Sequence, residues 1–182
     1  MSKEGKVFEE SLETSCKDQG IFFHRIKDTY IPPDLRRRVR VTKNKYDSLL
    51  FYKQFLFPVE LKSTKEKKFS FDESIIKQHQ IDSLKEAVKY EGVIAGFLFN
   101  FRQPENRAFF VHINDFLKYK NIAENGLDHT YKSKVNRASI PIGICEEIGT
   151  EITNVKKRTK YRYYINKLLD ELIDKYGEDI HK

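Results

Sequence analysis

Apolar residues recur at two different spacings along the first half of the chain. Phe8, Leu12 and Cys16 repeat at helical spacing, so the sequence predicts a helix over residues 5–18 that ends at Gly20. The short apolar runs that follow favour extended structure. We therefore expect three strands, over residues 21–26, 46–52 and 55–62.

The second half of the chain combines helical periodicity with one nearly continuous apolar run. Residues 74–90 and 162–177 show the periodicity of amphipathic helices. The run VIAGFLFNF, residues 93–101, is typical of a central strand that is covered on both faces. The remaining expected elements are a strand over residues 107–113 and a short helix from a cap at Asn114 to Tyr119. Together these elements predict an α/β domain with a central mixed β-sheet flanked by α-helices.

The length of the chain favours a single domain over residues 1–182, which is long enough to bury a core. Pro32-Pro33 interrupts regular structure, so residues 29–45 are predicted to form a basic arm or short stalk within that domain. Residues 121–182 are predicted to form a basic and helical C-terminal extension packed on the core. Within it, residues 121–140 are polar and are expected to be irregular.

Positive charge is concentrated at two places in the chain. The formal net charge is +7, with runs of basic residues at RRRVR, residues 36–40, and at KKRTKYR, residues 156–162. This distribution favours a polyanionic partner, nucleic acid before a membrane surface. The alternative interpretation is ordinary solvated surface charge, which the charge alone does not exclude.

The cysteines and the amino-terminal segment indicate a reducing, non-membrane setting. Cys16 and Cys145 are far apart and have no neighbouring metal-ligand pattern, so we expect free buried thiols. The sequence contains no run of about 18 apolar residues and no apolar signal region near Met1. We therefore expect a cytoplasmic, nucleoid-associated protein, encoded by a cell or by a phage acting in its host. We expect no membrane partner, and no small-molecule cofactor because a glycine-rich phosphate loop is absent.

The candidate chemistry lies in YDSLLFYKQFLFPVELKS, residues 46–63. If Lys53-Gln54 is a tight two-residue loop, continuing the register places Asp47 opposite Glu60, and Lys62 shares the face of Glu60. Two opposed carboxylates are destabilising unless a cation neutralises them, and Mg²⁺ or Mn²⁺ suits such oxygen ligands. The other interpretation is a surface salt bridge at the end of a strand.

Two further polar residues are candidates for the same site. Gln80 lies on the apolar face of its predicted helix and should point toward the sheet, where an amide needs a partner. That partner is either the acidic end of the hairpin or a loop carbonyl. Glu9 lies on the first helix beside the apolar stripe, and Glu10 and Glu13 are its rivals.

The order Asp47, Glu60-Leu61-Lys62 resembles the PD-(D/E)xK nuclease motif. The segments GKVFE (5–9), KQHQIDSLKEAVKYEGVIAGFLFNF (77–101), RAFFVHINDFLKY (107–119) and YRYYINKLL (161–169) are similar to the RecU Holliday junction resolvases. The resemblance implies a single nuclease domain of restriction-endonuclease-like fold, Mg²⁺ as the cofactor with Mn²⁺ as a substitute, and a homodimer. It implies that Asp47, Glu60 and the Leu61 carbonyl bind the metal, that Lys62 and Gln80 position water, and that Glu9 supports the metal.

The leading hypothesis is a metal-dependent endonuclease that resolves four-way (Holliday) DNA junctions in recombination and repair. Residues 29–44 are shorter than the RecU stalk, and Tyr46 replaces the usual Thr, which bears on junction selectivity rather than on the chemistry. The alternatives are a related nuclease for flap, mismatch or restriction-like DNA, a non-catalytic DNA-binding protein of this fold, and an adaptor without nucleic acid. The residues expected to contact DNA phosphates are Arg36, Arg37, Arg38, Arg40, Lys43, Lys45, Lys156, Lys157, Arg158 and Arg162.

Overall fold

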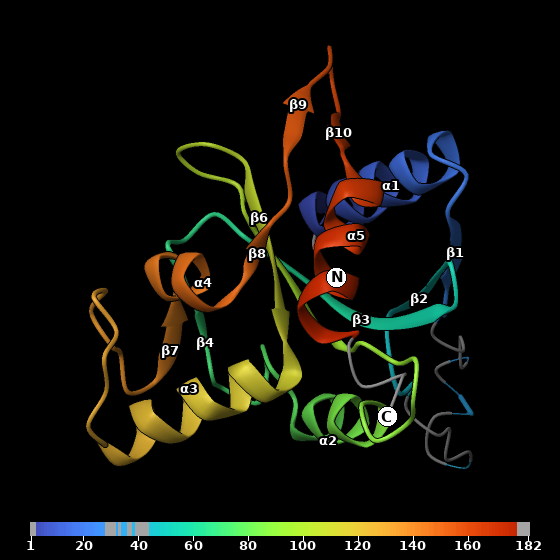
Figure 1. Ribbon diagram of the computed structural model, residues 1–182. Coiled ribbons are helices and arrows are strands. Elements are labelled where there is room, and N and C mark those ends of the chain that lie inside the picture. The colour runs from blue at the N-terminus through green and yellow to red at the C-terminus, as the bar shows by residue number, and fades with distance from the viewer. Residues whose placement is uncertain (1–2, 28–31, 33, 36–37, 39–43, 178–182) are drawn as a thin grey trace.

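The computed structural model describes residues 3–27, 32, 34–35, 38 and 44–177. Most of the predicted arm over residues 29–45 therefore lies outside the described residues. The rest forms a six-stranded mixed sheet in the order β1-β2-β3-β5-β6-β8, with helices on both faces (Figure 1). The strands β3 and β5 are parallel and the other pairs are antiparallel. The predicted mixed sheet flanked by helices is confirmed.

The elements follow one another in a mixed α/β order. The helices are α1 (Lys3–Asp18), α2 (Gln78–Ala87), α3 (Ile113–Asn125), α4 (Ile142–Ile148) and α5 (Ile165–Tyr176). The sheet strands are β1 (Phe22–Arg25), β2 (Ser48–Tyr52), β3 (Phe55–Thr64), β5 (Gly96–Phe101), β6 (Arg107–His112) and β8 (Thr150–Glu151). Two small pairs stand apart, β4 (Lys68–Ser70) with β7 (Ser139–Pro141) and β9 (Asn154–Lys156) with β10 (Tyr161–Tyr163). None of the described helices is long and apolar enough to span a bilayer.

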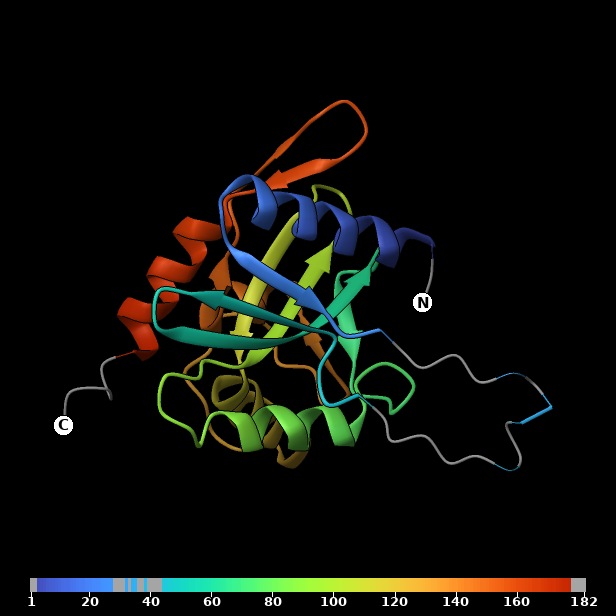
Figure 2. The same cartoon turned by 90° about the vertical axis from the view of Figure 1, so that its right-hand side faces the viewer.

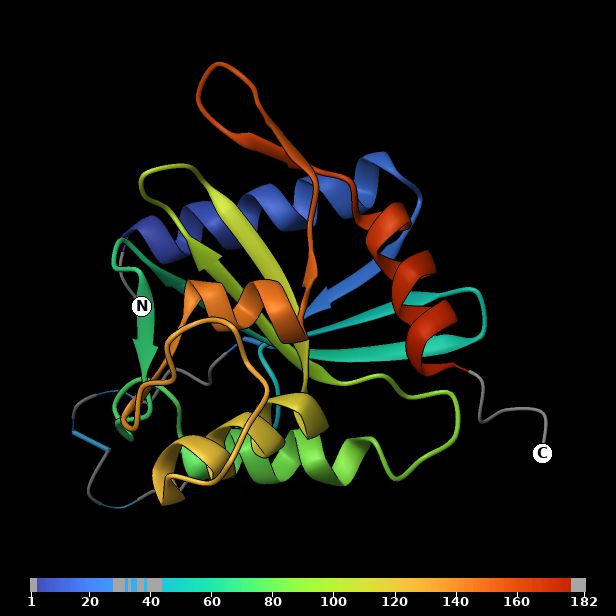
Figure 3. The same ribbon diagram turned by 60° about the vertical axis from the view of Figure 1, so that its left-hand side comes forward.

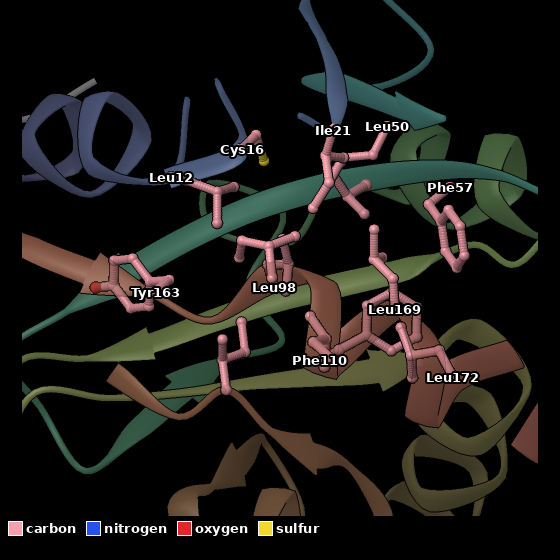
Figure 4. Close-up of a cluster of buried hydrophobic side chains, with 14 of the residues drawn as sticks. Leu12, Cys16, Ile21, Leu50, Phe57, Leu98, Phe110, Tyr163, Leu169 and Leu172 are labelled. Carbon is pink, nitrogen blue, oxygen red and sulfur yellow. The ribbon is translucent and has the colours of Figure 1, made fainter. Parts of the chain in front are cut away.

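Alternating side chains of β5 build the two cores, one on each face of the sheet. Leu98 faces the core under α1 and α5, where it packs with Leu12 and Leu169 (Figures 2 and 4). Phe97 and Phe99 face the opposite core, under α2, α3 and α4. All six residues of β5 are buried, so the predicted central strand covered on both faces is confirmed, although it begins at Gly96.

Two of the predicted helix starts are wrong because side chains cap the helices at other positions. The helix predicted from Ser74 begins at Gln78, because Lys77 is extended at φ −81° and ψ 140°. The Gln80 side chain accepts a hydrogen bond from the backbone N–H of Lys77 at 3.1 Å, which fixes this start. The N-cap of α3 is His112, whose Nδ1 accepts from the N–H of Asn114 at 3.3 Å.

The C-terminal part of the chain is more regular than expected. The segment predicted to be irregular over residues 121–140 contains the last turn of α3, through Asn125, and the start of β7 at Ser139. The basic run at residues 156–162 forms the β9–β10 hairpin, which projects from the body beside α1 (Figure 2). The predicted free, buried thiols are confirmed for Cys16 and Cys145, and burial raises the pKa of Cys16 to about 12.

Gly96 lies where β5 passes closest to β6. A Cβ added there would lie 2.3 Å from the carbonyl oxygen of Val111 and 2.8 Å from the ring of Phe110. We therefore expect Gly96→Ala to lower the free energy of unfolding by about 1–3 kcal/mol in a denaturant titration, as overpacked cores do. Gly143→Ala is the matched control, because its Cβ would meet the movable Ser133 hydroxyl at 2.7 Å. Equal stability of the two variants would contradict the prediction.

Candidate active site

The β2–β3 hairpin has the register that the sequence predicted. Tyr52 pairs with Phe55, and the ladder continues without a bulge to Ser48 and Val59. Lys53 adopts a positive φ of 54° in the loop, which lets Lys53-Gln54 close the hairpin. The strand β2 begins at Ser48, however, so Asp47 lies one residue beyond the ladder rather than within it.

Asp47 reaches across to β3 through its side chain. Its Oδ2 accepts a hydrogen bond from the backbone N–H of Leu61 at 3.0 Å, which places its carboxylate next to Glu60. Glu60 is only 2 % exposed. Burial is the largest cause that raises the pKa of Glu60, the negative charge of Asp47 raises it too, and Lys62 lowers it, so the pKa is about 8. Two carboxyl groups are therefore held together in a site where ionising both costs free energy.

Lys62 and Gln80 hold one oxygen of Glu60. The Lys62 ammonium donates to Glu60 Oε1 at 3.0 Å and to Gln80 Oε1 at 3.0 Å. The Gln80 amide nitrogen donates to the same Glu60 Oε1. Gln80 thus has its partners at the acidic end of the hairpin, and the alternative of a loop carbonyl as its partner is not what the structure shows. The start of α2 and the acidic pair are joined by this one amide.

The buried glutamate of α1 is Glu9, at 3 % exposure, whereas its rivals Glu10 and Glu13 are exposed. An ion pair of 2.7 Å joins Glu9 to Arg25 of β1. Burial raises the pKa of Glu9, Arg25 lowers it, and the charge of Asp47 raises it again, because the two carboxylates share one region. Arg25 was not expected from the sequence, since its contact to Glu9 depends on the packing of β1 against α1.

A solvent-accessible cleft of about 540 Å³ beside β3 collects these groups. All five predicted catalytic residues line it, together with Leu61 of the predicted metal set. Its rim carries two lysines that the sequence reasoning missed, Lys68 and Lys77. The sequence predicts Lys77 to lie within a helix and places Lys68 in no predicted element, so only the fold brings both beside the acids.

The oxygen donors of this cleft fit a small divalent cation. The carboxylates of Asp47 and Glu60, with a backbone carbonyl such as that of Leu61, form a hard donor set that water and phosphate oxygens can complete. Among the described residues, no group of three or more histidine, cysteine or acidic side chains is arranged to hold a metal. The acid pair, with Glu60 buried and Asp47 half-buried, supplies two carboxylates, which suits Mg²⁺ or Mn²⁺ because these ions keep several bound waters. The metal-binding roles themselves remain predictions.

The predicted DNA contacts divide into those that the structure describes and those that it does not. Arg36, Arg37, Arg40 and Lys43 lie outside the described residues. The described members are exposed, with Arg38 and Lys45 before the hairpin and Lys156, Lys157, Arg158 and Arg162 on the β9–β10 hairpin. Tyr163, next to Arg162 on β10, does not belong to this surface. It is a core residue at 1 % exposure, in edge contact with Phe8.

The chain is similar to a family model, to a curated relative and to a solved structure. Residues 40–164 match the family model described as RecU, Recombination protein U. The SPbeta prophage-derived uncharacterized protein YotM of Bacillus subtilis (strain 168) is 61 % identical over 174 residues, which cover 96 % of this chain and 89 % of that protein. The structure of Archaeoglobus fulgidus Hjc, a Holliday junction resolvase from an archaeal hyperthermophile, aligns with a TM-score of 0.47 and 13 % identity, over 79 % of this chain and 93 % of Hjc.

Proposed function

Because the chain belongs to the RecU family of recombination proteins, we propose that it is a metal-dependent endonuclease that resolves four-way DNA junctions. The family match confirms the resemblance carried by the sequence motifs. The observation that carries the proposed chemistry is the Asp47–Glu60 pair, in which Glu60 is buried and Asp47 half-buried, with Lys62 and Gln80 bound to one oxygen of Glu60. We do not expect a purely structural salt bridge to bury one carboxylate directly beside a second one in an open cleft.

The acid pair is the proposed metal site, with Asp47, Glu60 and the Leu61 carbonyl as ligands. Bound Mg²⁺ would supply electrostatic stabilisation of the phosphate and would lower the pKa of water. Lys62 presents its ammonium beside Glu60, where it would orient the attacking water or neutralise charge that develops on the phosphate. Gln80 holds Lys62 and Glu60 in place, and Glu9 adds a carboxylate within the electrostatic reach of Asp47.

The same proposal includes the substrate and the assembly. A four-way junction requires two cuts, so a homodimer with one cleft for each cut strand suits the reaction. Exposed basic groups such as Arg38, Lys45 and those of the β9–β10 hairpin would hold phosphates without reading sequence. Such an enzyme would act on DNA in the cytoplasm of the host cell.

The test is cleavage of a four-way junction, a flapped duplex and a linear duplex in parallel, with and without Mg²⁺. We expect Mg²⁺-dependent cutting of the junction in preference to the linear duplex. We expect Asp47→Ala to slow cutting by about 10³-fold or more, equivalent to about 4 kcal/mol of lost transition-state stabilisation, while the variant still binds the junction. Gel shifts at two salt concentrations measure that binding.

Each other outcome favours a different function. Cutting of linear duplex as fast as the junction would assign the chain to another class of DNA substrate. Junction binding without any Mg²⁺- or Mn²⁺-dependent cutting would favour a non-catalytic DNA-binding protein. Full activity of Asp47→Ala would remove the proposed metal site.

A further inference from the structure

Three connections leave the same end of the sheet. Thr64 at the end of β3 pairs with Phe101 at the end of β5, and Phe101 pairs with Arg107 at the start of β6. The strand β8 runs antiparallel to β6, so the β9–β10 hairpin that follows it also starts from this end. Figures 2 and 3 show the hairpin and the β5–β6 connection at this end, with the β3–β4 connection beside them.

Basic side chains stand on two of these connections outside the surfaces predicted from the sequence. We call them the basic ridge, which consists of Lys65, Lys67 and Lys68 before and at the start of β4, and Arg102 after β5. The three lysines are exposed, and no ion pair joins any of the four to a carboxylate within the part of the chain that the structure describes. Glu66 and Glu105 lie on the same connections, so the four cations outnumber the acids of this region two to one.

The basic ridge is continuous with the active-site cleft. Lys68, Thr64 and Glu66 line the cleft itself. A shallow depression of about 500 Å³ lies between residues 65–68 and Gln103-Pro104. The ridge therefore begins at the rim of the cleft and extends outward over the β3–β4 and β5–β6 connections.

Arg102 links this surface both to the hairpin and to the catalytic strand. A cavity of about 170 Å³ is lined by Arg102 and by Tyr161 of β10. The guanidinium of Arg102 donates to the Ser63 hydroxyl at 3.1 Å, and that hydroxyl donates to Asn100 at 2.9 Å. Since Ser63 follows Lys62 directly, Arg102 is held in a fixed position relative to the cleft.

We propose that the basic ridge binds the backbone phosphates of the duplex arm next to the cut strand and guides that strand into the cleft. The ligand class is a nucleic-acid backbone, because lysine and arginine side chains without a carboxylate partner neutralise phosphates and release counterions. The contacts position the duplex and do not read its sequence. The inference rests on the proposed function and adds a surface to it, which continues toward the basic residues of the β9–β10 hairpin.

The test compares two double variants that remove the same charge. The ridge variant, Lys65→Ala/Lys67→Ala, removes two ridge lysines. The control variant, Lys85→Ala/Lys118→Ala, removes two exposed lysines from α2 and α3, which lie away from the β9–β10 hairpin (Figures 1 and 3). Binding of a four-way junction is measured in EDTA over a range of salt concentrations, and circular dichroism checks folding. Phosphate-ethylation interference locates the contacts, and Mg²⁺-dependent cutting is measured separately.

For the ridge variant we expect binding about tenfold weaker or more at 0.1 M salt. We also expect a salt slope less steep by about 0.9 for each lost contact, and loss of interference at phosphates beside the cut site. The control variant should bind like the wild type, and adding Arg102→Ala to the ridge variant should weaken binding further. Unchanged affinity and slope in a folded ridge variant, or an equal loss in the control, would overturn the inference.

The two proposals can fail separately. Wild-type protein that binds junctions through the ridge but never cuts them would refute the nuclease and leave the ridge standing. If the wild type cuts junctions and the ridge variant binds them as tightly as the wild type, the ridge is refuted and the nuclease proposal stands. Wild-type protein that neither binds nor cuts a junction would refute both.

Discussion

Replacement of Glu60 by glutamine is expected to abolish junction cleavage and, in the absence of metal, to stabilise the protein at alkaline pH. Glu60 is 2 % exposed and lies beside Asp47, and its pKa is raised to about 8, first by burial and then by that neighbouring charge. Glutamine keeps the shape of the side chain and its contacts to Lys62 and Gln80, but it carries no charge. The variant therefore lacks one of the proposed metal ligands. It is also free of the energetic cost of burying an anion.

The direction of the pH effect follows from the raised pKa. The folded protein holds the Glu60 proton more tightly than the unfolded chain, whose carboxyl has a pKa of 4.5. The stability that this proton contributes is fully present below pH 4.5 and is lost as the pH rises to about 8. Each unit of pKa difference corresponds to about 1.4 kcal/mol, so the loss in the metal-free protein is on the order of a few kcal/mol.

Thermal unfolding of metal-free protein at pH 5 and pH 8 measures this effect. The melting temperature of the wild type should fall more between the two values than that of Glu60→Gln, and Glu91→Gln, an exposed control, should behave like the wild type. Addition of Mg²⁺ at pH 8 should raise the melting temperature of the wild type and not that of Glu60→Gln. A variant that still cuts junctions, or one whose melting temperature follows the wild type at both pH values, would contradict the assignment of Glu60.

The hairpin was predictable because its information is local. The apolar runs on either side of Lys53-Gln54 fix the strands, and a two-residue loop leaves one register, which the pairs from Tyr52–Phe55 to Ser48–Val59 confirm. The position of Asp47 just outside the ladder was not predictable in this way. Its side chain is fixed by the N–H of Leu61, a contact that alternation along a strand does not encode.

The parts of the site that the sequence missed depend on contacts between distant segments. Helical position favoured Glu9 over Glu10 and Glu13, but its ion pair with Arg25 depends on how β1 packs against α1, which the sequence does not encode. The basic ridge was hidden for a similar reason. A lysine-rich loop looks like solvated surface until the parallel pairing of β3 with β5 places Arg102 at the same end of the sheet.

Replacement of Lys62 by methionine is expected to slow junction cleavage by about 10³-fold while the protein still binds metal. The Lys62 ammonium is 3.0 Å from Glu60 Oε1 and from Gln80 Oε1, and its side chain is 15 % exposed, so it is held beside the acids but open to the cleft. Its removal takes away a cation that competes with metal for Glu60. It also leaves the pKa of Glu60 higher, so at alkaline pH, where Glu60 is ionised, affinity for Mg²⁺ should stay equal or rise. Groups that position or activate a reacting water contribute about 10²–10⁴ in rate, which is the loss expected here.

The separation of cutting rate from metal affinity distinguishes a chemical role for Lys62 from a structural one. Single-turnover cleavage at saturating Mg²⁺ measures the chemistry, and Mg²⁺-dependent thermal stabilisation measures the metal affinity. Gln80→Ala serves as the comparison, because it removes the group that holds Lys62 and leaves the ammonium itself, so its loss in rate should be smaller. If Lys62→Met instead lost metal affinity in parallel with rate, Lys62 would only shape the acid pair, and the positioning of water would have to come from another residue of the cleft.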